Sequence, residues 1–201
     1  MSMVQNIIIA GIFRSGKSTF SNMVSRKYGY QHVIMDSINE GFEKIFPELG
    51  INTKAKIDDI ERLKGISKKI APFINAMLES ERYNEFEPGM ILDVYELLPE
   101  DYIKYVNKNN CKIFYLLAGD LSVDERFKIF RKYDTKKHYS YFMDDKDLLE
   151  FCIRLVNENK IYKEQCIKHN LEYYETSIDR KNVFNSILKS ISNYDKIKNK
   201  K

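Results

Sequence analysis

The sequence predicts an α/β protein with a three-layer, doubly wound fold, in which helices cover both faces of a parallel sheet. Short apolar runs alternate with stretches of helical periodicity along the chain, which is the order expected when crossover helices join parallel strands. The chain has 201 residues, of which 43% are hydrophobic, enough for one sizeable core. We therefore expect a single domain over residues 1–195 and a basic disordered tail over 196–201.

Three strands are predicted in the first half of the chain, over residues 4–10, 31–36 and 89–93. Each is a short apolar run, the pattern of a strand that is buried on both faces. Apolar residues at helical spacing predict a helix over 17–28. A longer helical stretch separates the second strand from the third, and we expect Gly65 and Pro72 to interrupt it.

Two more strands are predicted in the second half, over residues 112–117 and 171–175. The helices expected there are a short one that starts at Pro99, then 123–132, 147–169 and 182–193. A polar, aromatic-rich loop through Met143 precedes the long helix. Its aromatic residues either stack on a base or anchor the loop on the core.

A complete Walker A motif follows the first strand directly and spans residues 11–19, Gly-Ile-Phe-Arg-Ser-Gly-Lys-Ser-Thr. In such a loop the backbone N–H groups converge on phosphate oxygens, and the next helix directs its positive end at the same anion. Lys17 is expected to reach the β- and γ-phosphates, and the Ser18 hydroxyl to bind Mg²⁺. The predicted nucleotide-binding residues of the loop are Gly11, Phe13, Arg14, Ser15, Gly16, Lys17, Ser18 and Thr19.

The charge and the cysteines exclude several classes of protein. The net charge is +4, and four lysines of the 196–201 tail supply all of it. Residues 1–195 are therefore neutral, which argues against nucleic acid as a partner, because nucleic-acid-binding proteins carry a basic patch on their folded domain. The three cysteines and three histidines are scattered, with no metal-binding spacing. The sequence contains no apolar stretch long enough to span a membrane and no signal-peptide pattern, so we expect a cytoplasmic protein. We expect it to be a monomer or a homodimer.

In its element order and its Walker A motif, the chain resembles the P-loop kinases of the nucleoside, nucleotide and shikimate kinase group. The resemblance implies a five-stranded sheet of order 2-3-1-4-5, with the ligand across the carboxyl ends of the strands. It also implies a substrate-binding insert at about 37–86 and an arginine-bearing lid at about 120–145. ATP, Mg²⁺ and a small-molecule acceptor are the expected ligands.

Two aspartates follow predicted strands. Asp36 closes the second strand and is our candidate for orienting the acceptor hydroxyl or taking its proton; the alternative is that it caps the next helix. Asp93 ends the third strand in the pattern of a Walker B carboxylate that holds Mg²⁺, or it is an ordinary strand-end residue.

Arginines are the expected partners of the transferring phosphoryl group. Arg126 and Arg131 lie in the lid, five positions apart, so a continuous helix places them on different faces and at least one is a surface residue. Arg180 follows the fifth strand, where the related kinases place the adenine pocket. Arg62 and Arg82 lie in the insert, where they could bind an anionic acceptor. Both belong to mixed-charge runs, so we favour the interpretation that they are solvated surface residues.

These features favour an ATP-dependent phosphotransferase that acts on a hydroxyl of a small molecule. No acidic residue follows Asp93 directly, which favours transfer over hydrolysis, and the chain lacks the Arg and Asp-Gly-x-Pro-Arg patterns that serve an acceptor phosphate in monophosphate kinases. The alternatives are a nucleotide-binding regulatory protein without kinase activity, and a nucleotide or polynucleotide kinase.

Overall fold

The computed structural model describes residues 6–53, 60–80 and 89–198, with side chains as far as Ile191. Its centre is a five-stranded parallel sheet of order β2-β3-β1-β4-β5, which confirms the predicted fold class. The strands are β1 (Asn6–Gly11), β2 (Gln31–Ile34), β3 (Met90–Val94), β4 (Cys111–Leu117) and β5 (Tyr173–Glu175). Because β1 pairs with β3 on one side and with β4 on the other, the strand that leads into the Walker A motif lies in the middle of the sheet.

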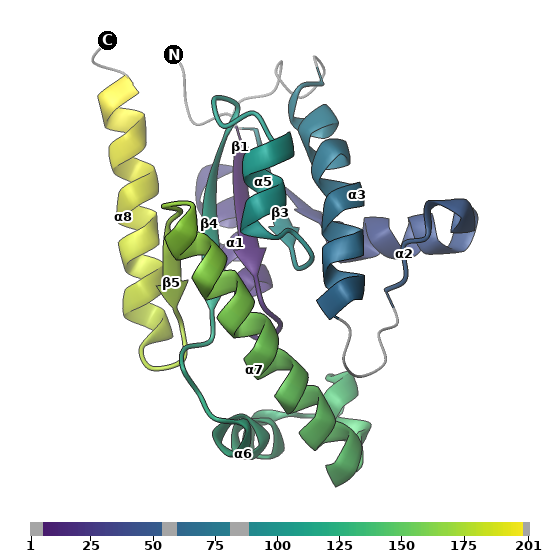
Figure 1. Ribbon diagram of the computed structural model, residues 1–201. Helices are drawn as coiled ribbons and strands as arrows, with labels where there is room; N and C mark the ends of the chain where they lie inside the picture. The colour runs from purple at the N-terminus through teal and green to yellow at the C-terminus, as the bar shows by residue number, and fades with distance from the viewer. Residues whose placement is uncertain (1–5, 54–59, 81–88, 199–201) are drawn as a thin grey trace.

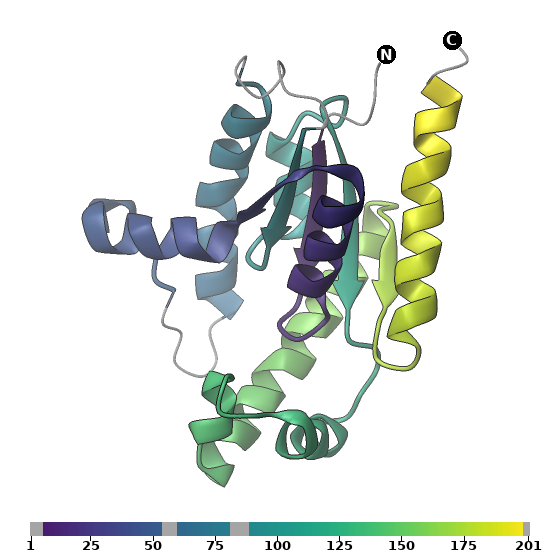
Figure 2. The same cartoon turned by 180° about the vertical axis from the view of Figure 1, so that it is seen from behind.

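Helices cover both faces of this sheet (Figures 1 and 2). One layer contains α3 (Ile60–Leu78), α5 (Pro99–Tyr105) and α7 (Asp145–Lys168), and the other contains α1 (Lys17–Tyr28) and α8 (Arg180–Lys198). Successive residues of β1 serve opposite layers, since Ile8 packs with the first set and Ile7 and Ile9 pack with the second. All three are fully buried, as a central parallel strand requires.

A small helical unit, which we call the lid because it contains the segment expected to form one, lies at the end of the sheet to which the strand arrows point (Figure 1). It consists of α6 (Val123–Tyr133), the 3₁₀ turn η2 (Tyr139–Phe142) and the first turns of α7. A capping box between Ser122 and Glu125 starts α6. The lid has its own apolar cluster, formed by Phe130, Leu148, Phe151, Cys152 and Leu155, so it packs as a unit beside the main core.

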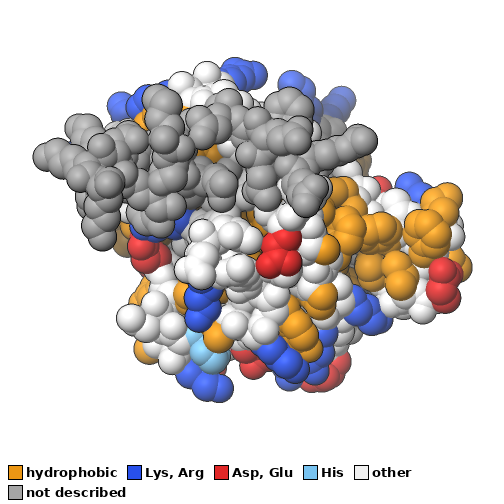
Figure 3. Space-filling view, turned by 90° about the horizontal axis from the view of Figure 1, so that it is seen from above, with side chains coloured by type: hydrophobic (Ala, Val, Ile, Leu, Met, Phe, Trp, Pro, Cys, Tyr) orange, Lys and Arg blue, Asp and Glu red, His pale blue; other side chains and the backbone are white. Residues whose placement is uncertain are grey.

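The insert after β2 forms an arm that extends from the body (Figure 1). It begins with α2 (Met35–Ile45) and the 3₁₀ turn η1 (Pro47–Leu49), and α3 follows. The arm presents apolar side chains to solvent (Figure 3); Ile45, Phe46 and Leu49 are all exposed. No described helix is long and apolar enough to cross a membrane.

Several details differ from the sequence-based expectation, and three of them concern β2, α3 and α8. β2 ends at Ile34, two residues earlier than predicted. α3 continues through Gly65 and Pro72, because its buried apolar stripe outweighs the local cost of a proline, which is about 3 kcal/mol in a helix interior. α8 continues to Lys198, past the expected end at 193, since no glycine or proline stops it. The backbone of 196–198, expected in a disordered tail, is therefore helical.

Candidate nucleotide and acceptor site

The Walker A motif forms a tight loop between β1 and α1. Gly11 has a φ of +125°, and a Cβ on it would lie 2.1 Å from the carbonyl oxygen of Leu116, so only glycine fits against β4. Gly16 has a φ of +94° and caps the amino end of α1. No side chain of the described residues caps this end. Its N–H groups are therefore free to bind an anion.

The side chain of Lys17 lies over the loop. Its Nζ donates a hydrogen bond of 2.9 Å to the carbonyl oxygen of Ile12 and sits 5.5 Å from the centre of the Tyr95 ring. Burial lowers the pKa of Lys17, while the nearby carboxylates of Asp93 and Asp36 oppose that effect. The ammonium group is held at the loop by a backbone carbonyl, an interaction that a phosphate oxygen can replace.

Ser18 and Asp93 are the two residues that the sequence assigns to Mg²⁺. Ser18 is exposed at the start of α1, and Asp93 is buried in β3 with its Oδ2 lacking a hydrogen-bond partner in the described part of the chain. His32 Nε2 lies 3.8 Å from that oxygen. Within the same residues no three His, Cys, Asp or Glu side chains gather into a metal cluster. Mg²⁺ usually takes one or two protein oxygens and completes its shell with phosphate and water.

Asp36 lies in the first turn of α2 rather than at the end of a strand. Ile34 is the N-cap residue of that helix, so the capping role that the sequence allowed for Asp36 is not observed. Although the side chain is accessible from a cavity, the surrounding protein raises its pKa to about 6, and the neighbouring carboxylate of Glu96 acts in the same direction. A carboxylate with a pKa close to neutrality is well suited to accept a proton.

The cavity beside Asp36 has a volume of about 580 Å³, within the range of small-molecule sites. Phe13 of the Walker A loop, Tyr95, Tyr139 and Arg154 line it together with residues of the insert. The insert, the lid and the loop after β3 therefore meet at one site.

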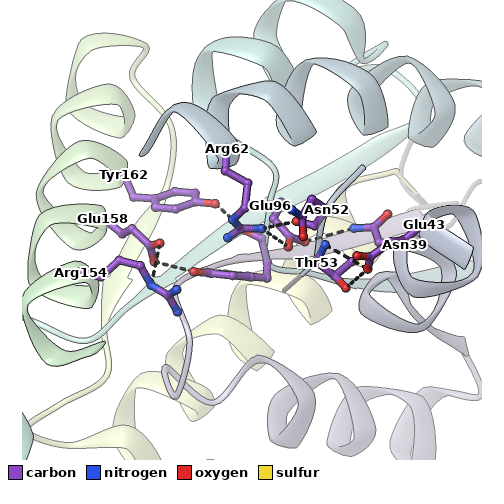
Figure 4. A network of polar contacts seen from close by, with 10 residues as sticks. Asn39, Glu43, Asn52, Thr53, Arg62, Glu96, Arg154, Glu158 and Tyr162 are labelled. Carbon is purple, nitrogen blue, oxygen red and sulfur yellow. Dashed lines mark hydrogen bonds and ion pairs between the residues drawn. The ribbon is translucent and has the colours of Figure 1, made fainter. Parts of the chain in front are cut away.

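One half of the polar network around this cavity centres on Glu96 (Figure 4). Arg62 Nη1 lies 3.5 Å from Glu96 Oε1 and donates a hydrogen bond of 3.1 Å to the carbonyl oxygen of Asn52. Asn39 donates to the other oxygen of Glu96 at 3.1 Å. The interpretation of Arg62 as a solvated residue is wrong, because the side chain is only 5% exposed. Arg82 lies outside the described residues.

The other half of the network centres on Glu158, which is fully buried in α7. Arg154 Nε lies 3.6 Å from Glu158 Oε1, and the Tyr95 hydroxyl donates to Oε2 at 2.6 Å. Tyr162 donates to the backbone carbonyl of Tyr95. These contacts connect α7 to the loop after β3, so the long helix is joined to the wall of the cavity beside Asp36.

A second cavity, of about 540 Å³, lies on the other side of the Walker A loop. Arg14, Arg126 and Arg180 line it, and none of its lining residues is acidic. Arg180 Nη2 donates to the carbonyl oxygen of Arg14 at 3.1 Å. Thr176 donates to the carbonyl oxygen of Ser15 at 2.8 Å, which ties the end of β5 to the loop. Ser15 itself donates to Ile12.

The two lid arginines have different surroundings. Arg126 is 3% exposed, and its Nε and Nη2 lack hydrogen-bond partners among the residues described. Burial lowers its pKa. Arg131 faces outward, and its Nε donates to Asp145 Oδ1 at 3.0 Å. The structure therefore favours Arg126 as the lid arginine that meets a ligand and gives Arg131 a role in joining α6 to α7.

Two residues of the Walker A motif point away from the loop. Thr19 lines a shallow groove on the outer face of α1. Phe13 packs edge-on against Tyr139 and Phe151, with ring centres 5.4 Å apart in each case. For Tyr139, the structure agrees with the interpretation of the loop aromatics as anchors. Arg14 pairs with Asp134 at the end of α6, so both Phe13 and Arg14 fasten the loop to the lid.

Sequence reasoning missed Glu96, Arg154, Glu158 and Tyr95. Glu96 carries a weak signal, since it follows the third strand by two residues. Arg154 and Glu158 lie within a mixed-charge helix, where nothing in the pattern separates a buried ion pair from a solvated one.

The chain is an α/β protein with a Walker A sequence motif directly after its central strand and with cavities lined by residues of that loop. The structure is similar to that of shikimate kinase from Aquifex aeolicus (TM-score 0.52, 16% identity, 94% of this chain and 96% of that one). Shikimate kinase from Acinetobacter baumannii, solved in complex with shikimate, matches with a TM-score of 0.52 and 15% identity, over 94% of this chain and 93% of that one. Dephospho-CoA kinase from Campylobacter jejuni matches with a TM-score of 0.50 and 14% identity, over 96% of this chain and 98% of that one.

No protein-family model and no curated protein matches the chain. At 14–16% identity, the similarity to solved structures shows the fold alone, which this chain shares with the two shikimate kinases and dephospho-CoA kinase.

Proposed function

We propose that this protein transfers the γ-phosphoryl group of ATP to a hydroxyl group of a small molecule. One observation carries the proposal. Consecutive residues of the Walker A loop line two different cavities, Phe13 the one that contains Asp36 and Arg14 the one that contains Arg126 and Arg180. A phosphate bound at the loop is thereby accessible from both sides, as a transfer between two bound molecules requires.

The cavity with three arginines is the proposed donor side. Its charge suits a nucleoside triphosphate, whose phosphates are bound by the loop N–H groups and by Lys17. Arg126, buried and with two nitrogens unpartnered in the described chain, supplies charge stabilisation for the transferring group. Ser18 and Asp93 would hold a Mg²⁺ ion, which would supply neutralisation of charge on the phosphates.

The other cavity is the proposed acceptor side. Asp36 orients the acceptor hydroxyl and takes its proton as the oxygen forms a bond to the γ-phosphorus. The bond from that phosphorus to the β,γ-bridging oxygen breaks, and ADP leaves with the electron pair. Phosphoryl transfer relies mainly on positioning and charge neutralisation, which the rigid connection of the insert to the loop after β3 supports.

The test is acceptor-dependent formation of ADP and of a phosphorylated product, followed by ³¹P NMR over a panel of hydroxyl compounds. The Lys17→Ala variant is expected to lose at least about 100-fold in rate, the effect of removing one donor that stabilises transition-state charge. Lys27→Ala, in the last turn of the same helix, is the control and should keep the rate. Full transfer by Lys17→Ala would refute the proposal, as would the absence of any acceptor-dependent product.

A further inference from the structure

Tyr95 lies at the point where β3 leaves the sheet beside the Walker A loop. In the pairing of β1 with β3, Val94 is opposite Ala10. The next residue along β1 is Gly11, the first of the Walker A motif, and the next along the other chain segment is Tyr95. Because neighbouring strands lie about 4.8 Å apart, the register of the sheet brings Tyr95 next to the loop.

The ring of Tyr95 lies against the ammonium group of Lys17. The Nζ atom is 5.5 Å from the ring centre, within the distance of about 6 Å at which cations are attracted to an aromatic face. Lys17 is buried, and such a contact is stronger when the cation is shielded from water. The carbonyl oxygen of Ile12, at 2.9 Å, is the hydrogen-bond acceptor of the same group. The ammonium is therefore held by one backbone oxygen and one ring.

The ring is itself fixed by two residues of α7. The Tyr95 hydroxyl donates to Glu158 Oε2 at 2.6 Å, and its backbone carbonyl accepts a hydrogen bond from the Tyr162 hydroxyl. Glu158 and Tyr162 are fully buried and project from the same face of the helix (Figure 4). Moving the ring would leave these buried polar groups without partners, which is costly. Donation to a carboxylate also polarises the phenol and favours its attraction for a cation.

This arrangement suits a lysine that must bind a phosphate. An ammonium group has three N–H donors, and the carbonyl of Ile12 uses one of them. A phosphate oxygen can take over that donor while the contact with the ring is kept. Ordering one long side chain during binding lowers affinity by about two- to tenfold, and a lysine that is already held in place avoids this loss.

We propose that Tyr95 is a positioning residue of the nucleotide site, whose ring, anchored by Glu158 and Tyr162, holds the Lys17 ammonium group in place before the nucleotide binds. This inference rests on the proposed function, in which Lys17 binds phosphates. It extends that function to a residue outside the Walker A motif and connects the phosphate-binding lysine to α7, whose first turns belong to the lid.

The competing interpretation is that the ring only fills space in the wall of the cavity beside Asp36. Two substitutions separate the interpretations. Tyr95→Phe keeps the aromatic face and loses the hydroxyl, whereas Tyr95→Leu fills similar space without an aromatic face. A role in packing is served by both side chains, but a role in holding a cation is served by phenylalanine alone.

The first experiment measures the order of the Lys17 side chain in the nucleotide-free protein. With ¹³C at the lysine Cε positions, the signal of Lys17 is identified by its loss in Lys17→Ala, and relaxation gives its order parameter. The order parameter is expected to fall in Tyr95→Leu and to stay close to the wild-type value in Tyr95→Phe. Lys27, in the last turn of the same helix, is the internal control and should not change. Equal order of Lys17 in the wild type and in Tyr95→Leu overturns the inference.

The second experiment is a double-mutant cycle on the affinity for ATP, measured by calorimetric titration with Mg²⁺ present. Tyr95→Leu should weaken binding about fivefold when Lys17 is present, the cost of ordering one long side chain. In the Lys17→Ala background the same substitution should change binding less than about twofold, because there is no ammonium to position. Tyr139→Leu is the matched control, since Tyr139 lines the same cavity but packs on Phe13; its effect should be equal in both backgrounds.

The outcomes separate this inference from the proposed function. Equal factors for Tyr95→Leu in the two backgrounds overturn the role of Tyr95 and leave phosphotransfer intact. Coupling between Tyr95 and Lys17 without any phosphorylated acceptor supports the role of Tyr95 and counts against transfer. If Tyr95→Leu does not fold, Tyr95→Met, which also lacks an aromatic face, takes its place in both experiments and is judged by the same results.

Discussion

The raised pKa of Asp36 gives the most direct prediction about the reaction centre. The carboxyl group should titrate at about 6 rather than near 3.8. About 90% of the molecules would then carry the ionised form at pH 7, but only about 10% at pH 5; an unperturbed aspartate would be over 90% ionised at both values. If Asp36 takes the acceptor proton, kcat/KM should fall about tenfold between pH 7 and pH 5.

The titration can be measured without an acceptor. In ¹³C-labelled protein the side-chain carboxyl signal of Asp36 is identified by its loss in Asp36→Asn and followed between pH 3 and pH 8. Two variants should move the titration in opposite directions. Glu40→Gln removes a carboxylate that raises the pKa of Asp36, so the pKa should fall; Lys17→Ala removes a cation that lowers it, so the pKa should rise.

A measured pKa below about 4.5 would refute the environment described for Asp36, and shifts of equal sign in the two variants would refute the assignment of its neighbours.

The same shift has a consequence for stability. The folded-state pKa lies above the unfolded value, so between about pH 4 and pH 6 the folded protein binds more protons than the unfolded chain. Stability from this group is full below that window and is lost as the pH rises through it. Asp36→Asn should therefore raise Tm relative to the wild type at pH 7 and change it little at pH 3.5. A lower Tm at pH 7 would contradict this.

The remaining predictions concern the arginines and their partners. Arg126→Gln should weaken transfer and nucleotide binding by about 100-fold. Arg131→Gln breaks an exposed ion pair, so it should change neither of these and should cost at most about 1 kcal/mol of stability. Nucleotide titration and calorimetry distinguish the two variants, and equal losses of nucleotide binding would contradict the choice of Arg126 as the arginine that meets the ligand. Glu96→Gln removes the carboxylate of a buried ion pair with Arg62 and should cost about 3–5 kcal/mol. Glu61→Gln, at a fully exposed pair, should have a much smaller effect on stability. Comparable effects in urea unfolding would show that the buried pair is not formed.

Much of the fold could be predicted because the relevant signals are local. The Walker A loop, the apolar runs of β1 and β4 and the helix start at Ser122 each depend on neighbours within a few residues. The exceptions have tertiary causes. Pro72 did not interrupt α3, because packing of the buried stripe on the sheet decided that element. Asp36 entered α2 because β2 stopped at the end of its pairing with β3.

By itself, the sequence determined that the chain is an α/β protein with a phosphate-type loop after its central strand, since both follow from local pattern and spacing. Only the tertiary structure decided which charges surround that loop. Arg62 and Glu96 are 34 positions apart, and the ion pair of Arg154 and Glu158 reaches the same site from α7. A side chain's charge is visible in the sequence, but its burial and its partner depend on which helices pack together. The two cavities beside the loop, and the side chains that line each of them, follow from that packing.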